Sequence, residues 1–523
     1  MPGPQQSLCP KCNQRPRRHP GARCLECYRL EQQAFRAGKR SPRAAVQIPD
    51  SESKRYARTL DAKRYLITSA QNATPAHPEF LATLKVAAKH LGAELVVVPY
   101  RYRNPSNAHR QTDLDHDEWW DPTLEPFLFN VRKKLGPNLV LCADVKIQPT
   151  ASSPLSGFES LTGAESCIIG APKMQLRAVP SPSGKSPKIL STTGACTRRS
   201  YSDTKAGKLG AFHHFLGAVI VELDGKRFHL RQINANRVTG EFTDLDRHYT
   251  AAGVRKAPPA LGLAMGDTHA RFTSPVVDSA RFVPGGVVDV LRPRALIFHD
   301  LFDGYSTNPH HKGDPFIAAA KMATGFGDVR AEVEHAVKFV ADRCKGRQAI
   351  IVSSNHDNFL ARWVCDNDWR TISSKEFYLE TATAMLLSTR IGPGGTERLD
   401  PFAYWVDKLK GKASIRCLAE DESYTLAGVE CGMHGHRGPN GSRGSMKNLS
   451  RLGVRAITGH RHTPGIEEGH YGLGTSTGDL EYAHGPGSWL NTDCVIYASG
   501  ARSLLTFVDG NWTTTKPLTR KRT

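Results

Sequence analysis

Two histidines one residue apart, His460 and His462, follow an apolar run and a glycine in the segment ITGHRHTPG. Imidazoles at the end of a buried strand can bind a metal ion, or they can be ordinary polar residues at a strand edge. Because the chain has 21 histidines among 523 residues, one His-x-His triplet has little weight by itself. A metal site therefore requires further ligands elsewhere in the sequence.

The same local pattern recurs through the second half of the chain, where apolar runs end in acidic, amide or imidazole residues. The five ends carry Asp267 and His269, Asp300 and Asp303, Asn355 to Asp357, His434 and His436, and His460 and His462. Buried strands alternating with helices predict a layered α/β domain in which the strand ends converge on one site. Because a carboxylate can bridge two ions while imidazole and amide groups fill the outer positions, this set suits a pair of divalent cations.

The order of these motifs resembles that of the calcineurin-like metallophosphoesterase superfamily, over residues 259–510. The motifs are Asp-x-His, Asp-x-x-Asp, Asn-His-Asp, a single His, and Gly-His-x-His. The resemblance implies a C-terminal β-sandwich flanked by helices that holds two metal ions. It implies that one ion is bound by Asp267, His269, Asp300 and His462, and the other by Asp300, Asn355, His434 and His460. It also implies that His356 protonates the leaving oxygen and that Asp303 orients His356.

The sequence departs from the family pattern at two positions and leaves one ligand open. His299 and Ser354 stand where the family usually has glycine, before the bridging aspartate and before the asparagine. We prefer His434 to His436 as the fourth histidine because His434 directly follows the predicted strand. The remaining histidines at 299, 310 and 311 are expected to be exposed loop residues.

A second metal site is predicted at the N-terminus, where two Cys-x-x-Cys pairs are separated by eleven residues. The four cysteines are Cys9, Cys12, Cys24 and Cys27. Thiolates at this spacing bind one structural Zn²⁺ tetrahedrally, and so short and polar a segment needs a metal to fold. Nearby basic residues, including Arg17 and Arg18, suit a phosphate backbone, although zinc ribbons also serve as protein-docking modules. The other eight cysteines are scattered, which fits reduced thiols.

The remaining elements suggest how the chain is divided. A strand at 64–70, a helix at 77–93 and a strand at 94–102 form a β-α-β unit, and a helical segment at 314–344 starts with Asp-Pro. The segment 191–208 is rich in hydroxyl and basic residues, which fits a solvated loop or a phosphate contact. We divide the chain into a zinc ribbon (1–36), a linker (37–62), an α/β domain whose role is open (63–258) and a metallophosphoesterase domain (259–523).

Charge and composition favour a polyanionic partner. Lys and Arg number 70 against 50 Asp and Glu, a formal charge of +20, which suits nucleic acid or an acidic membrane, or simply aids solubility. No run approaches the ~18 apolar residues that a membrane span needs. Because the first residues also lack the apolar core of a signal peptide, we expect a cytoplasmic protein without a membrane partner.

The ribbon, the charge and a glycine- and hydroxyl-rich segment at 434–453 together favour DNA as the substrate. In that segment Arg437, Arg443 and Lys447 could contact phosphates beside the metals. Within the superfamily the sequence is most similar to the DNA exonuclease branch related to bacterial SbcD. The segment HGHRGPNGSRGS followed by ITGHRHTPG, together with the N-terminal Cys-x-x-Cys pairs, also resembles the pre-early DNA-transfer nucleases of some tailed bacteriophages. This resemblance implies a virus-encoded, manganese-dependent DNase that acts on host DNA in the bacterial cytoplasm.

Two other functions stay open at this stage. One is a phosphoprotein phosphatase or small-molecule phosphodiesterase of the same fold, because fold does not determine substrate. The other is a DNA-binding scaffold with an inactive metal site. Endonuclease or exonuclease action, the formation of a homo-oligomer, and the choice of manganese over iron or zinc are equally open.

Overall fold

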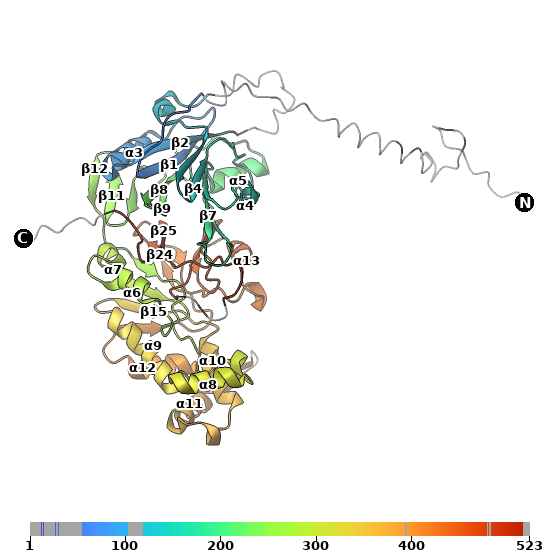
Figure 1. The fold of residues 1–523 in the computed structure, drawn as a ribbon, viewed down its shortest axis with the longest axis vertical. Helices are drawn as coiled ribbons and strands as arrows, with labels where there is room; N and C mark the ends of the chain where they lie inside the picture. The colour runs from blue at the N-terminus through green and yellow to red at the C-terminus, as the bar shows by residue number, and fades with distance from the viewer. Residues whose placement is uncertain are drawn as a thin grey trace, which may run out of the picture. The chain divides into compact units, whose positions relative to one another are not determined.

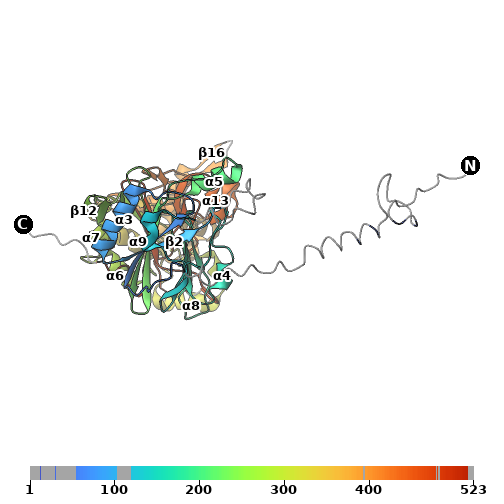
Figure 2. The same cartoon turned by 90° about the horizontal axis from the view of Figure 1, so that it is seen from above.

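The computed structural model describes residues 55–102, 119–392, 395–478, 480 and 483–515, together with residues 12, 14, 27 and 30. The chain forms two compact units, Met1–Arg55 and Tyr56–Thr523. The predicted zinc ribbon, with Cys9, Cys24, Arg17 and Arg18, and most of the predicted linker lie outside the described residues. The fold below is that of the second unit (Figures 1 and 2).

The predicted β-α-β unit is confirmed at the start of this unit. It consists of β1 (Arg64–Gln71), α3 (Pro78–Leu91) and β2 (Glu94–Tyr100), with β1 and β2 parallel. The side chain of His77 caps α3, and Gly92, with a φ of 59°, ends it. Two antiparallel strands, β8 (Gly217–Asp224) and β9 (Arg227–Asn234), complete a sheet of order β2-β1-β8-β9. A small sheet follows, formed by β10 (Phe242–Asp244), β11 (Arg247–Thr250) and β12 (Gly253–Lys256).

A six-stranded sheet contains the first three apolar runs of the metal motif. Its order is β18-β15-β14-β13-β24-β25. The strands are β13 (Gly262–Ala264), β14 (Ala295–Phe298), β15 (Gln348–Ile351), β18 (Ile415–Cys417), β24 (Thr492–Ile496) and β25 (Arg502–Thr506). Because β13, β14, β15 and β18 are parallel, their carboxyl ends lie at one edge of the sheet.

A ten-stranded sheet contains strands from both sides of the predicted boundary at residue 258. Its order is β19-β20-β21-β23-β22-β6-β7-β5-β4-β3. The strands are β3 (Arg132–Gly136), β4 (Leu139–Cys142), β5 (Ser166–Ile169), β6 (Leu176–Val179), β7 (Lys188–Thr192), β19 (Thr425–Leu426), β20 (Val429–Glu430), β21 (Arg455–Thr458), β22 (Gly465–Glu467) and β23 (His470–Gly472). Antiparallel pairing of β6 with β22, at Leu176 and Ile466, joins the two halves. The boundary at 258 therefore does not separate two compact units.

The two large sheets share a core, and helices cover the outer face of the six-stranded sheet. Ile297 and Ile350 point inward and pack in the cluster that contains Ile457 and Ile466 of the ten-stranded sheet. Alternate residues such as Phe298 point outward into a second cluster, as the two-residue period of a strand requires. That cluster includes α6 (Pro275–Phe282), α7 (Val287–Leu291), α9 (Val329–Arg343), α10 (Asp357–Asp366), α11 (Lys375–Ser388) and α12 (Pro401–Leu409). The expected mixed α/β class is confirmed.

The segment predicted as helical at 314–344 is two helices. Asp314 caps α8 (Pro315–Thr324), as the Asp-Pro start signal predicts. Gly325, with a φ of 71°, ends α8, and Asp328 accepts a hydrogen bond from the Ala331 backbone N–H to begin α9. Shorter elements are α4 (Phe158–Leu161), α5 (Lys205–His213), α13 (Met446–Ser450), β16 (Arg390–Gly392) and β17 (Gly395–Glu397). Within the described part of the chain, no helix is long and apolar enough to cross a membrane.

Candidate metal centre

The strand ends bring the predicted ligands to the same edge of the two sheets. Asp267, Asp300 and Asn355 follow β13, β14 and β15, which are neighbouring parallel strands. His434 and the His460/His462 pair follow β20 and β21, which are also parallel neighbours, in the facing sheet. The ligands thus come from both of the large sheets.

Three groups of described side chains are close enough to hold a cation each: the first is His269, Asp303 and His356, and the other two share Asp300. Of those two, one contains His269, Asp300 and His462, and the other contains Asp300, His434 and His460; within each group the ligand atoms lie within 4.8 Å of one another. His434 Nε2 lies 3.1 Å from Asp300 Oδ2, and His462 Nε2 lies 3.1 Å from Asp267 Oδ2. Asp300 belongs to two of the three groups, which is the position of a bridging carboxylate.

Several oxygens in the cluster are buried without a hydrogen-bond donor. Among the residues that the structure describes, these include Oδ1 of Asp267, of Asp300 and of Asn355. Buried polar atoms in folded proteins nearly always have a partner, and each exception requires an explanation. Carboxylate and amide oxygens that converge with imidazole nitrogens form a donor set for manganese, iron or zinc, so these residues fit divalent cations.

The electrostatics keep the carboxylates ionised, as metal ligands must be. Burial raises the pKa of Asp300, but nearby histidines, first His434 and then His356, outweigh it and hold the pKa well below its ordinary value. Burial likewise raises the pKa of Asp267, but the hydrogen bond from His462 and the charges of His462 and His434 together lower it below its ordinary value. A cluster that retains charged carboxylates at complete burial is ready to bind cations.

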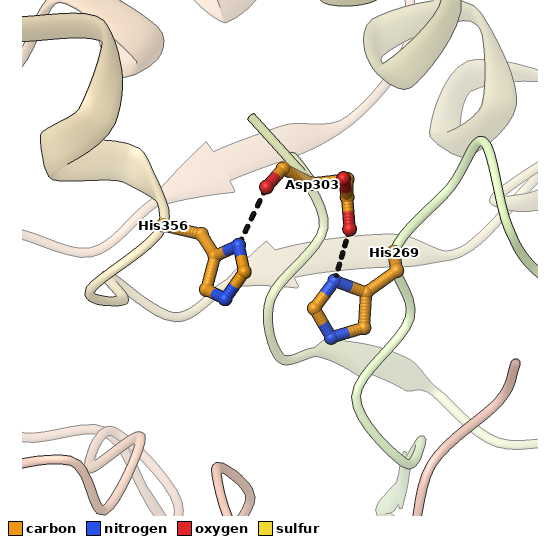
Figure 3. A group of neighbouring side chains, drawn as sticks. All are labelled: His269, Asp303 and His356. Atoms are coloured by element: carbon orange, nitrogen blue, oxygen red, sulfur yellow. Dashed lines mark hydrogen bonds and ion pairs between the residues drawn. The ribbon is translucent and has the colours of Figure 1, made fainter. Parts of the chain in front are cut away.

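Asp303 contacts two histidines through different atoms (Figure 3). Its carboxylate Oδ1 lies 2.8 Å from His269 Nδ1, and its backbone carbonyl accepts a 2.5 Å hydrogen bond from His356 Nδ1. We predicted that the Asp303 carboxylate orients His356; the structure corrects this, since only the backbone does so. The His269 backbone N–H donates to the Asp300 carbonyl at 2.7 Å and so aligns the loop after β13 with the loop after β14. This alignment places the Asp303 carboxylate beside His269 rather than His356.

The pairing with Asp303 also sets the chemistry of His269. Burial lowers the pKa of His269, but the carboxylates of Asp303, Asp300 and Asp267 together outweigh it, Asp303 most strongly, and raise the pKa to about 9. Because the carboxylate accepts a hydrogen bond from Nδ1, the Nε2 atom of His269 is directed toward the cluster, where it lies 3.3 Å from His462 Nε2. A carboxylate that fixes the ring of a metal-binding histidine is a recurrent feature of metal sites.

His434 and His436, the two alternatives for one metal ligand, differ in their burial and in their neighbours. His434 is buried beside Asp300, whereas His436 is half-buried and lies 3.8 Å from Glu420 Oε1. His299, predicted to be an exposed loop residue, is instead completely buried and stacks on His434 at 5.7 Å between ring centroids. His299, the residue directly after β14, is therefore part of the buried surroundings of the centre.

Strained backbone accompanies the ligands. His269, Asp300, His460 and His462 all have positive φ, between 43° and 71°. Left-handed backbone is unfavourable for side chains other than glycine and is concentrated at functional sites, where the surrounding structure imposes it. Four such residues in one cluster indicate that the loops are shaped to aim these side chains.

Three of the basic residues predicted to contact DNA phosphates, Arg437, Arg443 and Lys447, lie in the segment 434–453 that begins with His434. Arg437 forms an ion pair with Glu420, with 2.8 Å between Nη2 and Oε1. Arg443 and Lys447 are exposed. His310 is exposed, as predicted, and His311 is half-buried.

Sequence reasoning missed a buried ion pair that supports the Asp267 loop. Arg281 on α6 forms a bidentate pair with Asp493 on β24, at 2.8 Å and 2.6 Å. Asp493 Oδ1 accepts the Gly266 backbone N–H at 3.0 Å, and Ser476 donates its backbone N–H to the Asp267 carbonyl at 2.8 Å. No spacing rule signals this pair, because its members are far apart in sequence and each is a common residue type.

The fold and the site define a mixed α/β protein with a buried His/Asp cluster suited to two cations. No protein-family model matches the chain. The chain is 34% identical over 469 residues to a protein named Protein A1 from Escherichia phage T5, and the match covers 86% of this chain and 83% of that protein. The chain therefore belongs to the same family as Protein A1, a bacteriophage protein.

Proposed function

We propose that the protein is a dinuclear-metal phosphodiesterase that cleaves DNA. The observation that carries the proposal is the place of Asp300 in two of the three His/Asp groups, because a shared carboxylate positions two cations on one phosphoester. Two cations in these groups would supply an activated water and would neutralise charge on the entering and leaving oxygens. Asp267 and Asn355 would complete the two ligand sets.

His356 supplies the proton for the leaving oxygen in this proposal. Its Nδ1 donates to the Asp303 carbonyl, so its Nε2 is available to carry the proton that is transferred. His356 is half-buried, and its ring centroid lies 4.9 Å from that of His269, next to the groups that would hold the cations. A fixed ring beside the reacting phosphate is what general acid catalysis requires.

DNA is the substrate that the charge favours. The formal charge of +20 and exposed residues such as Arg443 and Lys447 suit a phosphate backbone. The bacteriophage relative supports a viral enzyme acting in the bacterial cytoplasm, and we propose manganese as its catalytic metal and zinc for the N-terminal cysteines. The phosphodiesterase fold with a β-sandwich core is part of the same proposal.

The test is DNA degradation by metal-depleted protein, with and without Mn²⁺, on supercoiled and linear DNA. The Asp300→Asn variant removes one charge from the shared carboxylate, so we expect at least a thousandfold loss of Mn²⁺-dependent cleavage with DNA binding retained. Degradation of linear DNA alone would indicate an exonuclease. If wild-type protein with Mn²⁺ leaves both DNAs intact but hydrolyses a phosphopeptide or small phosphodiester, the substrate assignment is wrong.

A further inference from the structure

A second candidate site lies in the region 63–258, and part of its lining comes from the segment 191–208, for which the sequence left a solvated loop or a phosphate contact open. A cavity of about 420 Å³ is lined by His77, Glu79, Thr197, Arg198, Arg199, His214, Leu216, Arg237 and Val238. None of these residues belongs to the His/Asp groups. We propose that this cavity binds the phosphate group of a nucleotide, either free or at the end of a DNA strand.

The charge of the cavity is the first argument. Three arginines face one carboxylate, that of Glu79, and Glu79 lies 3.1 Å from His77 Nδ1. Within the described part of the chain, neither Arg198 nor Arg237 forms an ion pair with a carboxylate. Burial and then the neighbouring guanidinium of Arg199 lower the pKa of Arg237, so these two cations lie close enough to repel each other. A phosphate is the ligand that guanidinium groups bind with paired hydrogen bonds.

The walls of the cavity are fixed by backbone contacts. The His77 N–H donates to the Cys196 carbonyl at 2.8 Å, and the Arg198 N–H donates to the Pro75 carbonyl at 3.0 Å. These bonds join the segment before α3 to the segment that carries Arg198 and Arg199. Because neither wall must be ordered when a ligand binds, the entropic cost of binding is reduced.

Hydrogen bonds also fix the loop that carries Arg237. His77 Nε2 lies 3.0 Å from the Arg237 carbonyl. Asn236 Oδ1 accepts hydrogen bonds from the Val238 and Thr239 backbone N–H groups, which closes a tight turn. A Cβ on Gly240 would lie 2.4 Å from the Phe80 backbone nitrogen, so this loop packs directly on the first turn of α3. The arginine is therefore presented from a preformed turn.

The size and the lining of the cavity select a nucleotide over a bare phosphate. Its volume is in the range of small-molecule sites, roughly 300–1,000 Å³, and too small for a duplex. Of the lining residues, Thr197, His214 and Leu216 are buried, and Val238 is an exposed apolar side chain. The amino end of the α3 helix, capped by His77, adds partial positive charge. The cavity thus offers cations for the phosphate and apolar surface for a sugar or base.

Binding can be measured without catalysis. Full-length protein carrying Asp300→Asn is stripped of metal and titrated calorimetrically with inorganic phosphate, with deoxyadenosine monophosphate, and with a short oligonucleotide that carries either a 5′-phosphate or a 5′-hydroxyl. The same titrations use the double variant Arg198→Gln with Arg237→Gln. The control is Arg255→Gln, an exposed arginine on β12 outside the cavity.

We expect the mononucleotide or the 5′-phosphorylated oligonucleotide to bind at least tenfold more weakly to the double variant, with the control unchanged. Tighter binding of the 5′-phosphorylated strand than of the mononucleotide would assign the site to strand ends, and the reverse would assign it to free nucleotides. Unchanged affinity in the double variant, or no binding of any phosphate compound at millimolar concentration, would overturn the proposal. This readout does not depend on whether the wild-type protein cleaves DNA.

Discussion

Gly459 shows how closely single residues are fitted around the metal centre. A Cβ at this position would lie 2.1 Å from Asp267 Oδ1 and 3.0 Å from His299 Cβ. Both neighbours are completely buried, so neither can move into solvent. Glycine is therefore required at position 459, because a side chain there would clash with Asp267, a proposed metal ligand.

We predict that Gly459→Ala displaces the Asp267 carboxylate. The substitution should lower the free energy of unfolding by about 1–3 kcal/mol, as overpacking does, and should weaken Mn²⁺ affinity at least tenfold. Calorimetric titration with Mn²⁺ and urea denaturation measure the two effects. Gly478→Ala is the control, because a Cβ there meets no atom within 4 Å. Equal Mn²⁺ affinity in Gly459→Ala and wild type would remove Asp267 from the ligand set.

The residue types of the centre could be predicted from sequence, but their partners could not. Each proposed ligand ends an apolar run, and that pattern is visible without a structure. The partner of the Asp303 carboxylate depends on how two loops align, and the burial of His299 depends on which way one side chain leaves a strand. Such contacts are set by tertiary packing, which motif spacing does not encode.

At the scale of elements, α6 and β24 support the loop that carries Asp267. The Arg281–Asp493 pair joins them in the interior, where both side chains are at most 1% exposed. Removing one partner of a buried ion pair leaves an uncompensated charge, which costs about 3–5 kcal/mol. Because Asp493 also accepts the Gly266 N–H, the loss should reach the metal centre.

We predict that Arg281→Leu lowers the free energy of unfolding by about 3 kcal/mol and weakens Mn²⁺ binding. Arg343→Leu is the matched control: Arg343 pairs with Asp278, also on α6, at 2.6 Å, but both side chains are over 20% exposed. A partly exposed pair contributes up to about 1 kcal/mol. If the two variants lose equal stability in urea denaturation and bind Mn²⁺ alike, the buried pair has no special role in supporting the loop.

The elements themselves could largely be predicted. Apolar runs indicated β1, β2, β13, β14 and β15, apolar periodicity indicated α3, and the Asp-Pro signal indicated the start of α8. The break between α8 and α9 was missed, because the apolar periodicity continues beyond Gly325 while the backbone turns there. Helix periodicity reports which side chains are buried, and a left-handed glycine ends a helix without interrupting that pattern.

At the scale of the whole molecule, strand pairing between distant segments could not be predicted. Composition and periodicity suggested a boundary at residue 258, yet β6 pairs with β22 and extends one sheet across it. The side chain of Gln232 on β9 further accepts the Leu504 N–H of β25 at 3.0 Å. Local patterns do not encode which strand edges meet, so an uninterrupted sheet can be mistaken for two domains.

We predict that a fragment of residues 259–523 does not fold alone. Without β6 and its neighbours, Ile457, Ile466 and Tyr471 lose part of the core they share with Leu176. Uncovering three such side chains costs about 5–9 kcal/mol, comparable with the roughly 5–15 kcal/mol that stabilises a whole domain. Thermal unfolding followed by circular dichroism should show no cooperative transition for this fragment, whereas residues 56–523 should unfold cooperatively as one compact unit. A fragment 259–523 that melts cooperatively and binds Mn²⁺ with wild-type affinity would show that the first strands of the ten-stranded sheet are dispensable for the metal centre.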